Sequence, residues 1–173
     1  MGVFLLLEPN AGRFTAMRTL ILIVFALLSS PAIAQGWERY DNARFGYSMD
    51  VPPVFAGSGE SDNGDGESFY NPSGAQGLVV WGAGLVGDFE GEVSSAMDYA
   101  IAENGWNITY QAVTPRWASF SGITNGRVLY QRMVLLCDGT SYAAFRAEYS
   151  STNMTDMTPV IERLVQSLKG SDC

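Results

Sequence analysis

The chain has 173 residues, with 18 acidic side chains, 10 basic side chains and no histidine. An acidic surface repels nucleic-acid phosphates and anionic lipids, which argues against nucleic-acid binding and peripheral membrane binding. Without histidine, the chain cannot form a Ser-His-Asp triad, a Cys-His pair or a histidine metal site.

Residues 17–34, "MRTLILIVFALLSSPAIA", predict a secretory signal peptide. Arg18 supplies the positive start, residues 20–28 form an apolar run, and the small residues at 32–34 form a cleavage site before Gln35. The apolar run is shorter than the roughly 20 residues that span a bilayer. We therefore expect an exported protein, periplasmic or extracellular, that has no membrane span after cleavage.

Residues 1–34 are accordingly assigned to a leader, in which either Met1 or Met17 is the true start. The leader holds one acidic and two basic side chains, so its removal leaves 17 acidic against 8 basic ones, a formal net charge of −9. Residues 35–173 then suit a single domain with one core.

The first half of this domain predicts strands and one helix. Residues 45–51 alternate apolar and polar side chains and end at two prolines, as a half-buried strand does. A short strand is expected at 68–71 and a longer one at 78–86. Apolar residues at helical spacing over 93–101 predict a helix, which Gly105 would end.

The second half predicts a run of hairpins and a closing helix. Asn125-Gly126 and Asp138-Gly139 are hairpin turn signals between the expected strands. Thr158 could cap the last helix, with Pro159 in its first position and Lys169-Gly170 at its end. The expected strands are 107–113, 117–123, 127–137 and 140–149, and the buried stripe of the helix is Met157, Val160, Ile161, Leu164, Val165 and Leu168.

The resulting order is four strands, a helix, four strands and a helix, joined by hairpin connections. This order predicts an α+β fold, in which helices pack on an antiparallel β-sheet. Two stretches resemble Mog1/PsbP-like domains: "RFGYSMDVPPVF" at 44–55 and "MTPVIERLVQSLKG" at 157–170.

The resemblance to Mog1/PsbP-like domains implies a small α/β/α sandwich that binds a protein or assists an assembly, with no common active site. No catalytic residue carries over, because the matching positions are strand and helix packing positions. Photosystem members of the family help retain calcium and chloride, and no ligand set in this chain matches theirs.

Two cysteines, Cys137 and Cys173, remain after the leader. In an oxidising compartment this even number favours a disulfide, which would tie the C-terminal tail to the sheet and add about 2–4 kcal/mol. Two free thiols or an intermolecular bridge are the alternatives. Two cysteines without histidine make a poor zinc shell, so no metal is expected there.

A glycine motif, Gly82, Gly84 and Gly87, matches the dinucleotide-binding pattern and lies between a predicted strand and a predicted helix. The acidic residues within 88–92 would oppose a pyrophosphate at the start of that helix. We therefore interpret the motif as a glycine-bent strand end.

Residues 60–74, "ESDNGDGESFYNPSG", suggest a calcium loop. With Gly66 at position 6 of an EF-hand loop, Ser61, Asn63 and Asp65 occupy the first three ligand positions. Position 12, which needs a bidentate glutamate, is Pro72, so the EF-hand assignment fails.

Two interpretations of this acidic loop remain. Asp62, Asn63, Asp65 and Glu67 could bind a basic partner or, weakly, a calcium ion; otherwise they form a solvated turn. No cofactor is expected apart from that weak calcium site.

Four tryptophans could serve packing or recognition. Trp81 and Trp117 lie in predicted strands and are expected in the core, whereas Trp37 and Trp106 flank elements and could be exposed to stack on a sugar or anchor a partner. The favoured function is a non-catalytic binding or accessory module with a protein partner. The alternatives are a carboxylate-based hydrolase, although no two carboxylates are placed together, and a calcium-dependent structural module.

Overall fold

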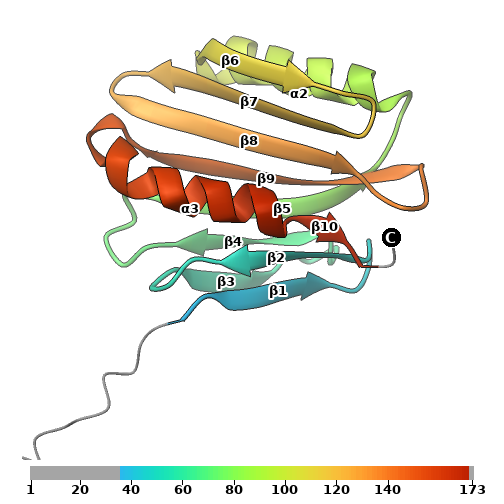
Figure 1. Cartoon of the computed structure of the whole chain (residues 1–173), viewed down its shortest axis with the longest axis horizontal. Helices are drawn as coiled ribbons and strands as arrows, with labels where there is room; N and C mark the ends of the chain where they lie inside the picture. Colours follow the sequence, from blue (N-terminus) through green and yellow to red (C-terminus); the bar gives the residue numbers. More distant parts are fainter. Residues whose placement is uncertain (1–35, 172–173) are drawn as a thin grey trace, which may run out of the picture. The chain divides into compact units, whose positions relative to one another are not determined.

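The structure is a computed structural model that describes residues 36–171 (Figure 1). The predicted leader and Cys173 lie outside these residues. The elements up to the first helix are β1 (Glu38–Asn42), β2 (Tyr47–Val51), β3 (Ala56–Glu60), β4 (Gly66–Tyr70), β5 (Gly77–Gly84) and α2 (Phe89–Asn104). The remaining elements are β6 (Asn107–Val113), β7 (Trp117–Thr124), β8 (Arg127–Leu135), β9 (Ser141–Ser150), the 3-10 turn η1 (Ser151–Asn153), α3 (Met154–Ser167) and β10 (Lys169–Gly170).

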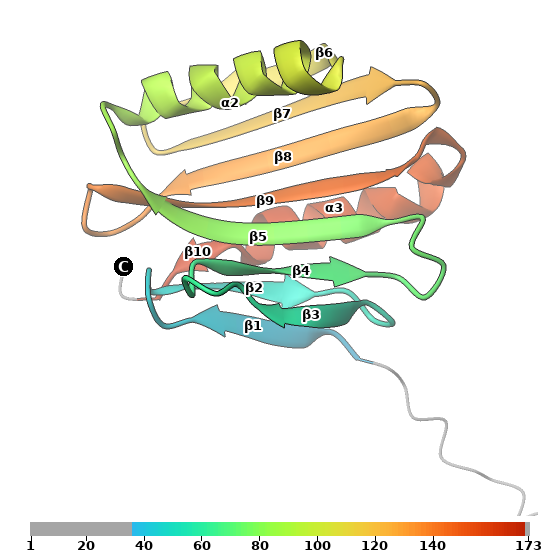
Figure 2. The same ribbon diagram turned by 180° about the vertical axis from the view of Figure 1, so that it is seen from behind.

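The strands form two antiparallel sheets. The larger sheet has seven strands in the order β3-β4-β5-β9-β8-β7-β6, so that β3 and β6 are its edges. The smaller sheet has the order β1-β2-β10. The predicted α+β class is confirmed: α3 and the small sheet lie on one face of the large sheet, and α2 lies on the other (Figures 1 and 2).

The core consists of two hydrophobic clusters rather than one, because both faces of the large sheet are packed. Side chains alternate along each strand, so Phe145 of β9 belongs to the cluster under α3 while its neighbour Ala144 belongs to the cluster under α2. Tyr47 and Leu164 also belong to the first cluster, and Phe120 belongs to the second.

Helix α2 confirms the prediction from sequence. Asp88 caps its N-terminus by accepting a hydrogen bond from the Gly91 N–H at 2.7 Å. Gly105 ends it in the left-handed region, with φ of 65°. The Asn125-Gly126 turn is also confirmed, because both residues have positive φ, as a type I′ hairpin requires.

Helix α3 begins earlier than predicted, at Met154. Thr158 is therefore an interior residue, whose hydroxyl donates to the Met154 carbonyl at 2.8 Å, and Pro159 lies inside the helix. The earlier start places Met157 one turn before Ile161 on the buried face, where both side chains are shielded from water. After α3 the chain continues into β10, which pairs with β2 and was not predicted.

Candidate functional site

The acidic loop, residues 60–67, is organised around Ser61. Its hydroxyl donates to Asp65 Oδ1 at 2.6 Å and accepts from the Gly66 N–H at 3.2 Å. The side chain of Asn63 donates to Asp65 Oδ2 at 2.9 Å. These donors, with Ser61 contributing most, hold the pKa of Asp65 below its usual value. The Asp65 carboxylate is thus satisfied inside the loop.

The other acidic side chains of the loop do not converge on Asp65. Glu67 Oε1 accepts from the Gly59 N–H at 3.0 Å on the neighbouring strand, and Asp62 is exposed. Among residues 36–171, no group of three or more acidic, cysteine or histidine side chains is arranged to hold a metal ion. The geometry is that of a hydrogen-bonded turn, and it lends no support to the calcium-dependent alternative.

The acidic loop is anchored to the core beneath it. The buried side chain of Asn42 donates to the Gly64 carbonyl at 3.0 Å, and the Tyr47 hydroxyl donates to the Asp65 carbonyl at 2.9 Å. Burial raises the pKa of Tyr47 well above its usual value, so this hydroxyl remains a donor. The side chain of Arg44 donates to the Asn63 carbonyl. The loop is therefore held in one position and presents Asp62 to solvent.

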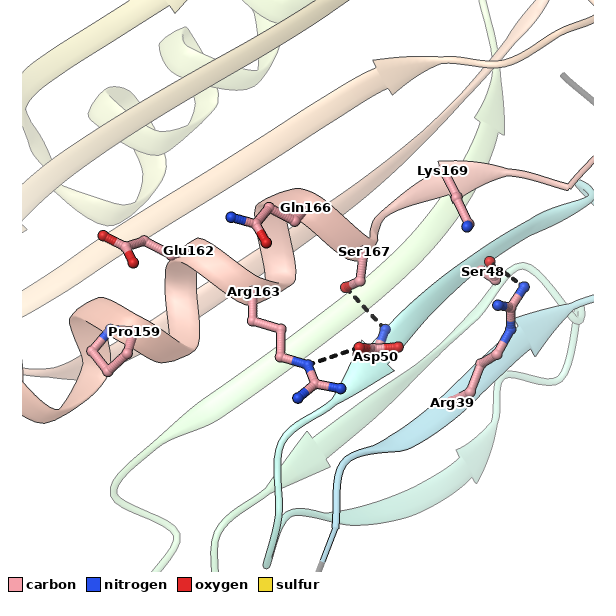
Figure 3. A pocket seen from close by; sticks show the side chains of 9 residues that line it. All are labelled: Arg39, Ser48, Asp50, Pro159, Glu162, Arg163, Gln166, Ser167 and Lys169. Atoms are coloured by element: carbon pink, nitrogen blue, oxygen red, sulfur yellow. Dashed lines mark hydrogen bonds and ion pairs between the residues drawn. The ribbon is translucent and has the colours of Figure 1, made fainter.

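A second feature is the groove between α3 and the small sheet, a cavity of about 490 Å³ (Figure 3). Three of the basic side chains, Arg39, Arg163 and Lys169, line it. Arg163 Nε lies 2.8 Å from Asp50 Oδ2, and the Asp50 N–H donates to Ser167 Oγ at 3.0 Å. In this groove, α3 is therefore joined to β2 by the ion pair of Arg163 with Asp50 and by the hydrogen bond from Asp50 to Ser167.

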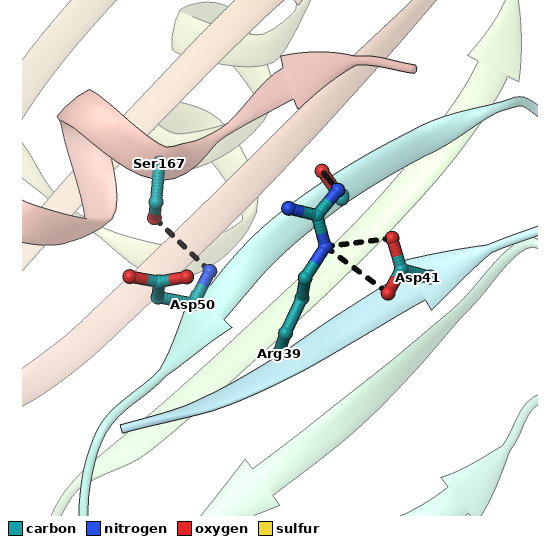
Figure 4. A network of polar contacts seen from close by, with 5 residues as sticks. Arg39, Asp41, Asp50 and Ser167 are labelled. Atoms are coloured by element: carbon teal, nitrogen blue, oxygen red, sulfur yellow. Dashed lines mark hydrogen bonds and ion pairs between the residues drawn. The ribbon is translucent and has the colours of Figure 1, made fainter. Parts of the chain in front are cut away.

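The remaining arginine of this groove is also paired (Figure 4). Arg39 Nε lies 2.9 Å from Asp41 Oδ1, and its Nη2 donates to Ser48 Oγ at 2.8 Å. Exposed ion pairs of this kind add about 0–1 kcal/mol each. Because carboxylates on the same surface balance its guanidinium groups, the groove does not single out an anionic ligand.

The aromatic residues correct one expectation. Trp106 is only 4% exposed, so the prediction that it could be exposed was wrong. Trp106 follows Gly105, which ends α2. The backbone N–H of Trp106 donates to the Ala100 carbonyl at 3.1 Å, and this turn places the indole in the cluster under α2. Trp37 is half-buried beneath the Arg163 guanidinium, 4.3 Å from the ring centroid.

The two tryptophans expected in the core are also half-buried. Trp117 lies under the Arg132 guanidinium, 4.2 Å from the ring centroid, on the α3 side of the large sheet. Trp81 lies on β5, on the α2 side.

Of the three glycines in the glycine motif, only Gly82 is needed for packing. A side chain at Gly82 would meet the ring of Phe45 at 2.6 Å, whereas the space around Gly84 and Gly87 is open. The helix start that would receive a phosphate is already occupied by the capping carboxylate of Asp88. Gly82 and Gly84 lie at the end of β5, which agrees with the interpretation of the motif as a strand end.

The carboxyl groups with displaced pKa values do not suggest acid catalysis. Hydrogen bonds from Ser141 and the Thr140 N–H lower the pKa of Asp138, as donors do for Asp65. A glycosidase acid needs the opposite displacement, a raised pKa.

No helix within residues 36–171 has the length and apolar character needed to cross a membrane.

The edge strand β6 was not singled out from sequence. It has no charged residue and lies at one end of the seven-stranded sheet. Tyr110 and Val113 of β6 are 49% and 43% exposed, and Ile123 of the adjacent β7 is 47% exposed. In the sequence, the signal for β6 is seven strand residues without a charged side chain. This signal identifies a candidate docking edge only when the position of β6 at the edge of the sheet is known.

Comparison with known proteins relates this architecture to solved structures only. No family model matches the chain, and no curated protein matches it. The solution structure of cyanobacterial PsbP from Synechocystis sp. PCC 6803 aligns with a TM-score of 0.62 at 9% identity, covering 82% of this chain and 96% of that one. The Ran-binding protein Mog1p of Saccharomyces cerevisiae aligns with a TM-score of 0.57 at 10% identity, covering 80% and 97%. A mutant of protein Mog1 gives 0.58 at 10% identity, covering 79% and 97%.

The sequence identities are too low to carry over a function, and the alignments cover most of every chain compared. The structural alignments agree with the resemblance to Mog1/PsbP-like domains that was predicted from the sequence. The domain has the Mog1/PsbP-like fold.

Proposed function

We propose that this domain is a non-catalytic binding module, exported from the cytoplasm, whose partner is a protein that adds an extended segment to β6. The observation that carries the proposal is the uncharged edge strand β6 with its exposed apolar neighbours. The likeness to a protein named as Ran-binding supports a protein partner in general, without identifying one.

The two edges of the large sheet differ in a way that favours β6. Edge strands are usually blunted by charge, bulges or short length, because their free N–H and C=O groups pair with other chains. β3 has these features: it has five residues, including Glu60, and its register with β4 shifts between Gly57 and Glu60. β6 also has one register shift, between Ile108 and Tyr110, but it is longer, with seven residues, and has no charged side chain.

A strand added to β6 would gain both main-chain and side-chain contacts. The main-chain groups of β6 would provide affinity, and the side chains on either face would provide specificity. Tyr110 lies opposite Ser121 in the ladder and shares a face with Ile123, whereas Val113 lies opposite the buried Ala118 on the other face. The partner segment would therefore be apolar on both faces.

The acidity of the domain predicts the charge of its partner and the salt dependence of their association. With a formal charge of −9 after leader removal, the domain should attract a partner with a basic surface, and association should slow as salt rises. Asp62 is the loop carboxylate that is free of internal hydrogen bonds within the described region. Asp62→Asn should lower the association rate and leave the unfolding midpoint unchanged.

The test begins with tagged residues 35–173 in the native host. Partners recovered with the wild type are identified by mass spectrometry, and their binding kinetics are measured against purified variants. Tyr110→Lys combined with Val113→Lys should weaken binding at least about tenfold, because two charges then occupy the docking edge.

The control is Tyr70→Lys, which adds one lysine at a similarly exposed tyrosine (47%) on β4. Because it adds one positive charge, it should bind no more weakly than Asp62→Asn does. Equal affinity of the β6 double variant and the wild type would contradict the proposal. So would turnover in a screen of glycosides and esters that is abolished by a single carboxylate substitution.

A further inference from the structure

The face of the large sheet that carries α2 is only partly covered. α2 lies over the β6 end of the sheet and leaves β5, β4 and β3 without a covering helix (Figure 2). At the boundary, residues of α2 and of the strands β5, β9 and β8 line an open cavity of about 410 Å³. This volume lies within the range of about 300–1,000 Å³ that is usual for small-molecule sites.

The cavity has an aromatic wall and one cationic group. Trp81 of β5, Tyr142 of β9 and Tyr99 of α2 line it, together with Arg146 of β9. Val79, Arg146 and Gln131 lie in one row across β5, β9 and β8. Arg146 and Tyr142 are four residues apart on the same strand, so they mark two ends of a cavity about 13 Å long.

Arg146 lacks a carboxylate partner in residues 36–171. Its Nε donates to the oxygen of the buried Gln131 at 3.1 Å, which orients the guanidinium, and no ion pair or hydrogen bond within these residues engages its two terminal nitrogens. Glu148, whose charge acts on Arg146 without forming an ion pair with it, lies 3.6 Å from Arg127 and is paired with it. Burial lowers the pKa of Arg146, and the charge of Glu148 opposes this shift.

The contrast with the other arginines is informative. Arg39, Arg127 and Arg163 are each paired with a carboxylate. Arg132 is also half-buried and unpaired with an acid within the described chain, but it stacks on Trp117 and donates to Ser119. Arg146 therefore combines partial burial, an orienting amide and free terminal donors that line a cavity.

We propose that this cavity binds a small carboxylate with a planar or apolar body. Arg146 would hold the carboxylate through two parallel N–H···O hydrogen bonds, the geometry in which arginine binds carboxylates best. The body would lie along Trp81 and Tyr99, toward Tyr142 and Glu92 at the far end. Glu92 accepts from the Val86 N–H at 2.8 Å, so the far end is acidic and disfavours a second carboxylate there.

The probes are 3-phenylpropionate and its uncharged amide, measured by isothermal titration calorimetry with purified residues 35–173. A dipeptide ending in phenylalanine, with a free or an amidated C-terminus, distinguishes a free small molecule from a chain end as the natural source. The carboxylate probes should bind saturably in the millimolar range or tighter, and each amide should bind at least about tenfold more weakly.

Two variants change the site in different ways. Arg146→Gln removes the cation, and Ser95→Trp fills the mouth of the cavity from the exposed side of α2 without changing Arg146. Both should lose about tenfold or more in affinity while their urea unfolding remains cooperative. Arg163→Gln makes the same change of charge in the groove beside α3 and should bind as the wild type does.

Three results would overturn the proposal. The first is equal affinity for the carboxylate and its amide. The second is unchanged affinity in Arg146→Gln or Ser95→Trp. The third is the absence of saturable binding of either carboxylate probe to the folded wild type. None of these results depends on β6, so failure here and failure of the partner-binding function are separate outcomes.

Discussion

Replacing Gly66 with alanine should destabilise the domain by about 2–3 kcal/mol. Gly66 is buried at the start of β4, opposite Trp81 of β5. A Cβ added there would lie 2.7 Å from the Trp81 Cα and still closer to the Val80 carbonyl oxygen. Both obstacles are backbone atoms of an interior strand, so neither a side-chain rotation nor a small shift relieves the contact.

The magnitude follows from two opposed effects. Overpacking typically costs about 1–3 kcal/mol, and the rigid obstacle places Gly66 at the upper end of this range. Alanine restricts the unfolded chain and so returns about 0.4–1 kcal/mol. The matched control is Gly84→Ala in β5, where the space is open and φ is not positive. That variant should have unchanged or slightly raised stability.

The assay is equilibrium unfolding in urea of residues 35–173, with each alanine variant beside the wild type. Gly66→Ala should lower the midpoint by about 1 M or more with little change in slope. A wild-type midpoint for Gly66→Ala would refute the close-approach argument. Equal losses in both variants would also refute it, since the effect would then follow from glycine replacement in general.

Three further predictions concern processing, the cysteines and acid stability. The exported protein should begin at Gln35, and N-terminal sequencing that finds the leader retained would contradict this. Cys137 and Cys173 should be linked within one chain; intact mass after alkylation under denaturing conditions should show no labelled thiol, and Cys173→Ser should lower stability by about 2–4 kcal/mol without abolishing the fold. The pKa of Asp138 is below the usual 3.8, so its contribution to stability is present at neutral pH and is lost as pH falls through the lowered value. Ser141→Ala should bring this pKa back toward 3.8 in an NMR titration; an unchanged value would show that Ser141 is not its main cause.

The locally determined elements could be predicted from the sequence. The helix over 89–104 follows from apolar spacing and a terminal glycine, and the Asn125-Gly126 turn follows from the preference of these residues for positive φ. The start of α3 could not be predicted in the same way. The cap preference of Thr158 and Pro159 is weak, and the burial of Met157 against a distant sheet outweighs it.

The candidate sites depended even more on tertiary structure. Trp106 had a local signal that was overlooked, because a large apolar residue just after a helix-ending glycine usually packs back on the helix. Arg146 had none, since its neighbours Gln131, Trp81 and Tyr99 come from three other elements. The loop carboxylates were evident in the sequence, but only the structure shows that Asp65 is bound by Ser61. A triple replacement of the loop carboxylates would therefore disturb the turn, and Asp62 alone is the cleaner probe.

The pairing of β10 with β2 governs when the domain can finish folding. β2 lies near the beginning of the described region, whereas β10 and α3, which pack against it, come from the other end. Asp50 and Ser167, which share a hydrogen bond, are 117 residues apart in the sequence. Contacts so distant in sequence slow folding, because the intervening chain must first be ordered. A nascent chain that lacks its last segment thus leaves one side of the first core cluster open to water. Under the proposed export, this topology would delay the native state until the chain has passed through the membrane.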